Sequence, residues 1–138
     1  MRVIEFLRQY DIQNRKAERL RREYEKQKSE IDEISSPLGS DGMPHGTNVS
    51  KKVENQAVRL ADKLLEYEIA KLDALEKRQE VFDVICDVPG IEGDVLYERY
   101  VDLKLWAEIE QDLHYSRSQL HRIELKAIKK INMAHNDT

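Results

Sequence analysis

The chain has 138 residues, of which 36% are charged and 7% are aromatic, with five glycines and three prolines. This composition suits long solvated helices better than a large globular core. No apolar run approaches the roughly 20 residues of a membrane span, and we expect no signal peptide. The single cysteine, Cys86, excludes an intramolecular disulfide, and the four histidines show no metal-ligand spacing. We therefore expect an all-α cytoplasmic protein without cofactor or metal.

The first predicted helix covers residues 1–34 and carries a heptad pattern. Eight of its ten seam positions are apolar or aromatic and none is charged, which is typical of a coiled coil. A helix of this kind is marginal alone and needs a facing helix. Its partner is either a second copy of the chain, giving a homodimer, or the next long helix of the same chain. The seam residues are Val3, Phe6, Tyr10, Gln13, Ala17, Leu20, Tyr24, Gln27, Ile31 and Ile34.

Residues 35–49 contain two prolines and three glycines, and we expect a flexible loop there. Helical pattern resumes over residues 50–88 and stops at Pro89 and Gly90. A third helix is expected over residues 91–101, with Val95, Leu96 and Tyr100 facing inward. The predicted apolar stripe of the 50–88 helix comprises Val53, Ala57, Leu60, Leu64 and Tyr67, continued with a slight drift by Leu65, Ile69, Leu72, Leu75, Phe82 and Ile85.

The last quarter of the chain predicts a helix, a tight turn and a second helix. Ser116 is a good N-cap, and Gln119 completes a capping box, so a new helix begins at Arg117. Its apolar residues recur at spacings of three and four and define one buried stripe: Leu120, Ile123, Ala127 and Ile131. Residues 90–134 are therefore expected to form a small helix-turn-helix bundle, followed by a short tail at 135–138.

The C-terminal helix is basic although the chain as a whole has a net charge of −4. Residues 65–112 carry five Lys/Arg and fourteen Asp/Glu, whereas residues 116–134 carry five Lys/Arg and one Glu. Because electrostatic effects are local over a Debye length of about 8–10 Å, the basic helix can meet DNA phosphates. The acidic region would also suit a basic protein partner. The candidate DNA-binding residues are Arg117, Ser118, His121, Arg122, Lys126, Lys129 and Lys130.

Residues 116–131, Ser-Arg-Ser-Gln-Leu-His-Arg-Ile-Glu-Leu-Lys-Ala-Ile-Lys-Lys-Ile, resemble the recognition helix of sigma factor region four. The wider arrangement is similar to small phage-encoded late-gene transcription regulators of the ArpU-like type. In these a charged N-terminal helix, a glycine loop with Met-Pro and a long helix precede a characteristic aromatic block. The matching residues are Met43, Pro44, Tyr100, Trp106, Glu108, Ile109, Leu113, Tyr115 and Ser116.

The resemblance implies a sequence-specific regulator that binds promoter DNA in the bacterial host, with RNA polymerase as a further partner. Arg117, Ser118 and Arg122 match the DNA-contacting positions. Two departures concern the turn: Glu110 stands where helix-turn-helix units favour a small residue, and His114 stands where glycine would be left-handed without cost. The alternative is a helical adaptor, or a phage packaging subunit that recognises DNA, whose coiled coil binds a partner. The sequence shows no recognisable set of catalytic residues, and we expect that the protein is not an enzyme.

Overall fold

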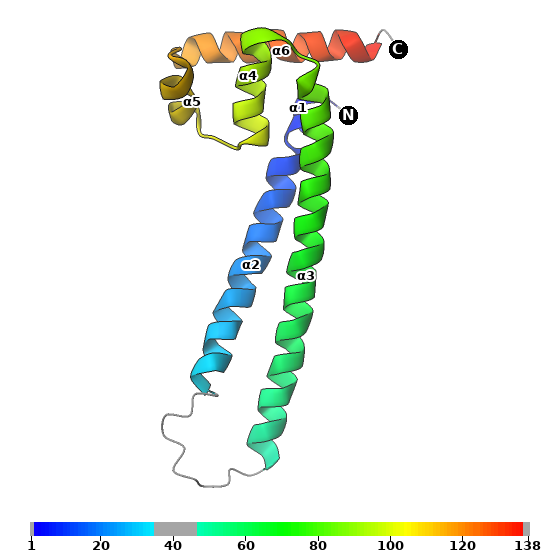
Figure 1. The fold of residues 1–138 in the computed structure, drawn as a ribbon, viewed down its shortest axis with the longest axis vertical. Helices are drawn as coiled ribbons and strands as arrows, with labels where there is room; N and C mark the ends of the chain where they lie inside the picture. Colours follow the sequence, from blue (N-terminus) through cyan, green and yellow to red (C-terminus); the bar gives the residue numbers. More distant parts are fainter. Residues whose placement is uncertain (1, 35–46, 137–138) are drawn as a thin grey trace. The chain divides into compact units, whose positions relative to one another are not determined.

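The computed structural model describes residues 2–34 and 47–136, and every regular element in these residues is a helix, which confirms the all-α prediction (Figure 1). The predicted loop at 35–49 lies outside the described residues except for 47–49, which belong to the second long helix. The helices are α1 (Val3–Leu7), α2 (Gln9–Ile34), α3 (Thr47–Cys86), α4 (Gly90–Leu96), the π-helix η1 (Tyr97–Val101), α5 (Trp106–Leu113) and α6 (Arg117–Asn136).

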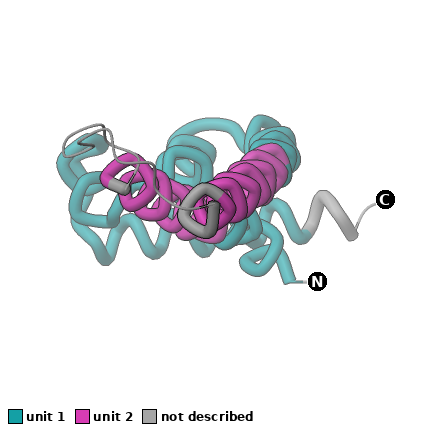
Figure 2. Tube along the Cα trace, turned by 90° about the horizontal axis from the view of Figure 1, so that it is seen from below, with its two compact units in different colours: residues 1–13, 73–138 teal, residues 14–72 magenta. Residues whose placement is uncertain are grey.

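The chain divides into two compact units, which we describe separately (Figure 2). Unit 1 comprises residues 1–13 and 73–138, and unit 2 comprises residues 14–72. Unit 2 is a helical hairpin built from most of α2 and the first part of α3. Unit 1 contains α1, the first residues of α2, the end of α3 and all the C-terminal helices.

In unit 2 the heptad seam of α2 faces α3 of the same chain. Ala17 is 1% exposed, and the later seam residues up to Ile31 are half-buried. On α3 the facing residues are Leu60, Leu64 and Tyr67, which are half-buried, together with the buried Ala70. The hairpin therefore supplies the facing helix that the heptads require. Pairing between two chains stays a prediction.

The predicted continuation of the α3 stripe is wrong for four of its six residues, whereas Ile85 is buried and Phe82 is half-buried. Leu65, Ile69, Leu72 and Leu75 are 56%, 51%, 65% and 47% exposed. The residues buried in their place are Ala70, Ala74 and Val81, and Ala57 of the first part of the stripe is exposed as well. The sequence of α3 carries two apolar rows on different sides, and the buried row includes the small residues Ala70 and Ala74. Alanines at these positions allow the close approach of a neighbouring helix backbone.

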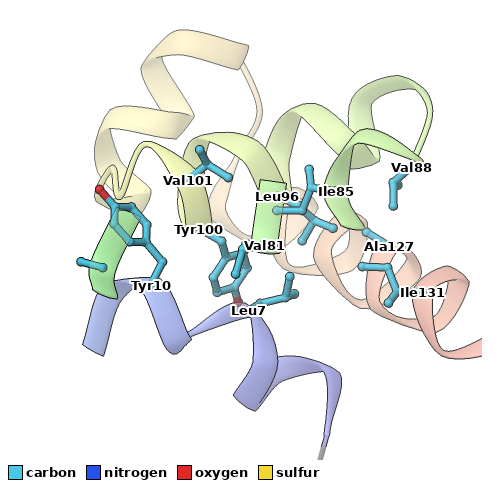
Figure 3. Close-up of a cluster of buried hydrophobic side chains, with 11 residues drawn as sticks. Leu7, Tyr10, Val81, Ile85, Val88, Leu96, Tyr100, Val101, Ala127 and Ile131 are labelled. Atoms are coloured by element: carbon cyan, nitrogen blue, oxygen red, sulfur yellow. The ribbon is translucent and has the colours of Figure 1, made fainter. Parts of the chain in front are cut away.

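Unit 1 has a core in which residues from both ends of the chain meet (Figure 3). The break between α1 and α2 at Arg8, which the heptad pattern did not predict, follows Leu7, a fully buried residue of this core. The first residues of α2, the end of α3, the α3–α4 turn, α4, η1 and α6 supply the rest. The buried members are Leu7, Tyr10, Ala74, Val81, Ile85, Val88, Leu96, Tyr100, Val101, Ala127 and Ile131.

The predicted third helix is present as α4 and η1. Val95, Leu96 and Tyr100 are all buried, as expected. The helix begins at Gly90 and its last five residues, Tyr97–Val101, form a π-helix rather than a continued α-helix. Single π-turns of this kind are uncommon, and α4 with η1 positions the segment that leads into α5. The other boundary differences are small: α3 ends at Cys86, and α6 extends to Asn136 into the predicted tail.

Candidate nucleic-acid interface

The α5–α6 segment forms the predicted helix, turn and helix. The C-cap of α5 is His114 in a left-handed conformation (φ 59°, ψ 42°), and its N–H donates to the Glu110 carbonyl at 2.9 Å. The Ser116 N–H donates to Gln119 Oε1 at 2.9 Å, and the Gln119 N–H donates to Ser116 Oγ at 3.3 Å. This reciprocal pair is the predicted capping box, and α6 begins at Arg117 as expected.

Two apolar clusters hold α6 along its length. Near its start, the fully buried Leu120 packs with Val95 of α4 and Ile109 of α5, and Trp106, Leu113, Tyr115 and Ile123 are packed around them. Further along, Ala127 and Ile131 enter the larger core of unit 1. Three members of the predicted stripe are therefore buried and Ile123 is half-buried. The side of α6 opposite this stripe is left exposed to solvent.

The exposed side of α6 carries cations and no carboxylate. Ser118, Arg122, Lys126 and Lys129 are exposed, and none has an ion-pair partner among the described residues. Leu125, on the same side, is 58% exposed. Glu124 is the only acidic residue of α6, and its carboxylate accepts a 2.9 Å hydrogen bond from the hydroxyl of the buried Tyr100. This contact holds the one negative charge of the helix on its inner side.

The remaining candidates lie at the edges of α6 and have partners. Arg117 Nε lies 3.0 Å from the Glu110 carboxylate, and Lys130 forms an ion pair with Glu92. The ring of His121 lies 4.9 Å from that of Trp106, centre to centre. The structure thus places all seven candidates on one helix but separates them into two groups. Ser118, Arg122, Lys126 and Lys129 share the outward face, whereas Arg117, His121 and Lys130 are engaged by unit 1 itself.

The expectation that Glu110 crowds the crossing of α5 and α6 is not supported by its position. Its side chain is 32% exposed and bridges the two helices through Arg117. A carboxylate that reaches solvent in this way does not hold the helices apart. Glu110 and Arg117 are seven residues apart and lie on different helices. Ion pairs are recognised in a sequence when the partners are three or four residues apart in one helix, so this pair could not be predicted.

Two further residues that sequence reasoning missed stabilise the entry to α5. The Arg99 guanidinium lies 5.0 Å from the centre of the Trp106 ring and donates to the Lys104 carbonyl at 2.9 Å. The Lys104 ammonium lies 3.3 Å from the Glu98 carboxylate and 2.9 Å from that of Asp112. These contacts raise the pKa of Lys104, chiefly through the hydrogen bonds to Asp112 and Glu98. Lys104 thereby offsets the charges of two carboxylates, those of Glu98 and Asp112.

The buried hydroxyl of Tyr100 keeps its proton to unusually high pH. Burial is the main cause of its raised pKa, and the nearby negative charge of Glu124 adds to it. Tyr100 therefore remains a neutral donor to Glu124 throughout the physiological range.

Among the described residues, no helix is both long and apolar enough to cross a membrane. The same residues hold no cluster of His, Cys, Asp or Glu suited to a metal ion. No protein-family model, curated protein or solved structure matches the chain.

Proposed function

We propose that the chain is a sequence-specific transcription regulator of phage or prophage genes that binds double-stranded promoter DNA through α6. The single observation that carries the proposal is the outward face of α6. Four DNA-compatible side chains lie there in one row, without a carboxylate and without ion-pair partners among the described residues. The proposal places the protein in the cytoplasm of the bacterial host and makes it a binding protein rather than an enzyme.

The geometry suits the major groove, which is about 12 Å wide and accepts one α-helix. Ser118 and Arg122 lie in the first two turns of α6, where the recognition helix of a helix-turn-helix unit reaches base edges. Lys126 and Lys129 lie on average about 11 Å further along the axis, at 1.5 Å per residue, toward the phosphate backbone. We assign base reading to Ser118 and Arg122, and phosphate anchoring to Lys126 and Lys129.

Two parts of the proposal rest on other grounds. RNA polymerase as a second partner follows from the resemblance to sigma factor region four alone. A homodimer through the N-terminal helices follows from the heptads, and it requires residues other than those already facing α3. Neither is needed for DNA recognition by α6.

The test is DNA binding by the full chain and two kinds of variant. Repeated selection from a random duplex pool supplies a preferred site, and fluorescence anisotropy then measures affinity for this site and for a scrambled duplex across salt concentrations. Arg122→Ala should cost about 1–3 kcal/mol on the preferred site and little on the scrambled one. Lys129→Gln should weaken both duplexes alike and lower the log–log salt slope by about one unit.

Lys130→Gln is the matched control, because Lys130 adjoins Lys129 but is paired with Glu92. We expect it to change the salt slope much less than Lys129→Gln does. Failure to enrich any duplex would refute DNA recognition. Equal losses from Arg122→Ala on both duplexes would reduce α6 to a non-specific basic patch. The adaptor alternative would then be favoured.

A further inference from the structure

One apolar side chain lies among the cations on the outward face of α6. Leu125 is 58% exposed and, among the described residues, it packs in neither of the two apolar clusters that hold the helix. Its neighbours on the same side are the exposed residues Ser118, Arg122 and Lys129. At about 100° per residue these four residues lie within roughly 60° of arc, opposite the buried stripe. Leu125 therefore lies in the middle of the row that is proposed to meet DNA.

The position of Leu125 along α6 places it beside the base-reading residues. Arg122 precedes it by three residues, which is about 4.5 Å along the helix axis at 1.5 Å per residue. Successive base pairs are about 3.4 Å apart. If Arg122 reaches a base edge, Leu125 therefore faces the same groove one or two base pairs away. Leu125 is about 12 Å along the axis from Arg117, the first residue of α6, and this length is comparable to the width of the major groove.

A single exposed leucine is common on protein surfaces and does not by itself indicate a contact. The two residues that flank Leu125 in the row make the difference here. Arg122 lies one turn before it and Lys129 one turn after it, and both are exposed cations without an ion-pair partner among the described residues. A DNA duplex that contacts both cations also covers the leucine between them. The occupant of this position is therefore set by the charges on either side.

Leucine gains free energy only against apolar surface, and the base edges of the major groove offer one such group. Guanine, adenine and cytosine present atoms that donate or accept hydrogen bonds, whereas thymine also presents its C5-methyl group. A leucine packed against a polar edge displaces water from it and provides no hydrogen bond in return. Leu125 would therefore favour thymine, and disfavour the other bases, at the position that it faces.

We propose that Leu125 reads the C5-methyl group of a thymine, one or two base pairs from the base that Arg122 reads. The inference rests on the proposed function and deepens it, because it names a chemical feature of the preferred site. Arginine pairs best with O6 and N7 of guanine. The preferred site therefore contains a thymine close to a guanine, and Leu125 is a specificity-determining residue.

Deoxyuridine isolates the contribution of the methyl group, because it differs from thymidine in that group alone. The preferred duplex obtained by selection is made again with each of its thymines replaced in turn by deoxyuridine. Fluorescence anisotropy measures the affinity of the full chain for every duplex. We expect one replacement to weaken binding about fourfold, the factor that corresponds to burial of one methyl group, and the others to change it little.

Leu125→Ala tests whether the leucine is the residue that senses the methyl group. This variant should bind the thymine duplex about fourfold or more weakly than the wild type, and it should no longer distinguish thymine from deoxyuridine. Leu125→Met keeps a long apolar side chain and should retain most of the distinction. Alanine and methionine are both good helix formers, and the urea midpoint verifies the fold of each variant.

The matched control is Leu72→Ala, which makes the same change at a leucine of α3 that is 65% exposed. It should leave the affinity for both duplexes unchanged. A loss of affinity in this control would show that removal of any exposed leucine weakens binding, and would refute a specific contact of Leu125.

Two further results would overturn the inference while leaving DNA recognition intact. The first is a preferred site in which no thymine is sensitive to replacement by deoxyuridine. The second is a sensitivity that persists unchanged in Leu125→Ala, because another side chain or the stiffness of the duplex would then be its cause. Failure to enrich any duplex is a different result: it would refute DNA recognition, and this inference with it.

Discussion

Replacing Gly93 with alanine should destabilise unit 1, although alanine is the better helix former. Gly93 is a buried residue of α4, and a Cβ placed on it would overlap the carbonyl oxygen of Val88 and lie 3.2 Å from its carbonyl carbon. These atoms are backbone in the α3–α4 turn and cannot rotate away as a side chain would. Gly93→Ala therefore requires α4 or the turn to shift.

The magnitude follows from two opposed effects. Alanine in a helix interior gains about 1 kcal/mol over glycine. Overpacking a well-packed site costs about 1–3 kcal/mol, and a backbone neighbour places the cost toward the upper end. Moving α4 would also disturb Val95 and Leu96, which are fully buried in the two clusters of unit 1. We expect a net loss of about 1–2 kcal/mol in the free energy of unfolding.

Urea unfolding followed by Trp106 fluorescence measures this loss. Trp106 is the only tryptophan, and it packs against the cluster that contains Val95, so it reports on unit 1. With a slope of about 2 kcal/mol per molar urea, the midpoint should fall by about 0.5–1 M. Gly90→Asn is the control, since Gly90 has φ +71° in open space and asparagine tolerates that conformation. A midpoint for Gly93→Ala at or above that of the wild type would refute the close approach of α4 to Val88.

The remaining predictions concern the turn and the buried tyrosine. His114→Gly should raise the free energy of unfolding by about 0.5–1 kcal/mol in the same urea assay, because it relieves a left-handed conformation, whereas His114→Ala should not. Glu110→Gln should lower stability by less than about 1 kcal/mol, as expected of an exposed pair, and should not reduce DNA affinity, because it releases Arg117; a weakened complex would contradict this. Tyr100 has a raised pKa in the folded state, so its stabilising effect is complete below about pH 10 and is lost as the pH rises further. Between pH 9 and 11.5 the urea midpoint of Tyr100→Phe should therefore fall less than that of the wild type. An equal fall in both proteins would show that ionisation of Tyr100 does not cause the loss of stability.

The C-terminal helix could be predicted well because the features that define it are local. Ser116 and Gln119 form the capping box within four residues, and the position of Leu120 fixes which side is buried. The left-handed turn at His114 was also evident from its place between two helical patterns. Local hydrogen bonds and helical periodicity depend on nearby residues only, so the sequence contains what is needed to recognise them.

The long helix α3 shows where this reasoning fails. Its apolar residues form two rows, and periodicity alone does not decide which row packs against α2. Large side chains such as Leu65 and Leu72 suggested burial, yet the smaller Ala70 is buried, because the choice depends on how closely two helices approach. The π-helix at Tyr97–Val101 likewise depends on packing. So does the ion pair of Glu110 and Arg117, which joins residues across a turn.

The net charge of −4 is a poor guide to the partners of this chain, because one side of a helix can carry a charge that differs from that of the whole chain. On α6 the single carboxylate is held inward by Tyr100, which leaves the outward side with cations only, whereas on α3 Arg59 and Lys63 line a groove together with Asp62 and Glu66. Arg122→Ala should therefore weaken DNA binding and leave the urea midpoint unchanged, because Arg122 is exposed and has no ion-pair partner among the described residues. A lowered midpoint would show that Arg122 stabilises unit 1, and the loss of affinity would then not report a DNA contact.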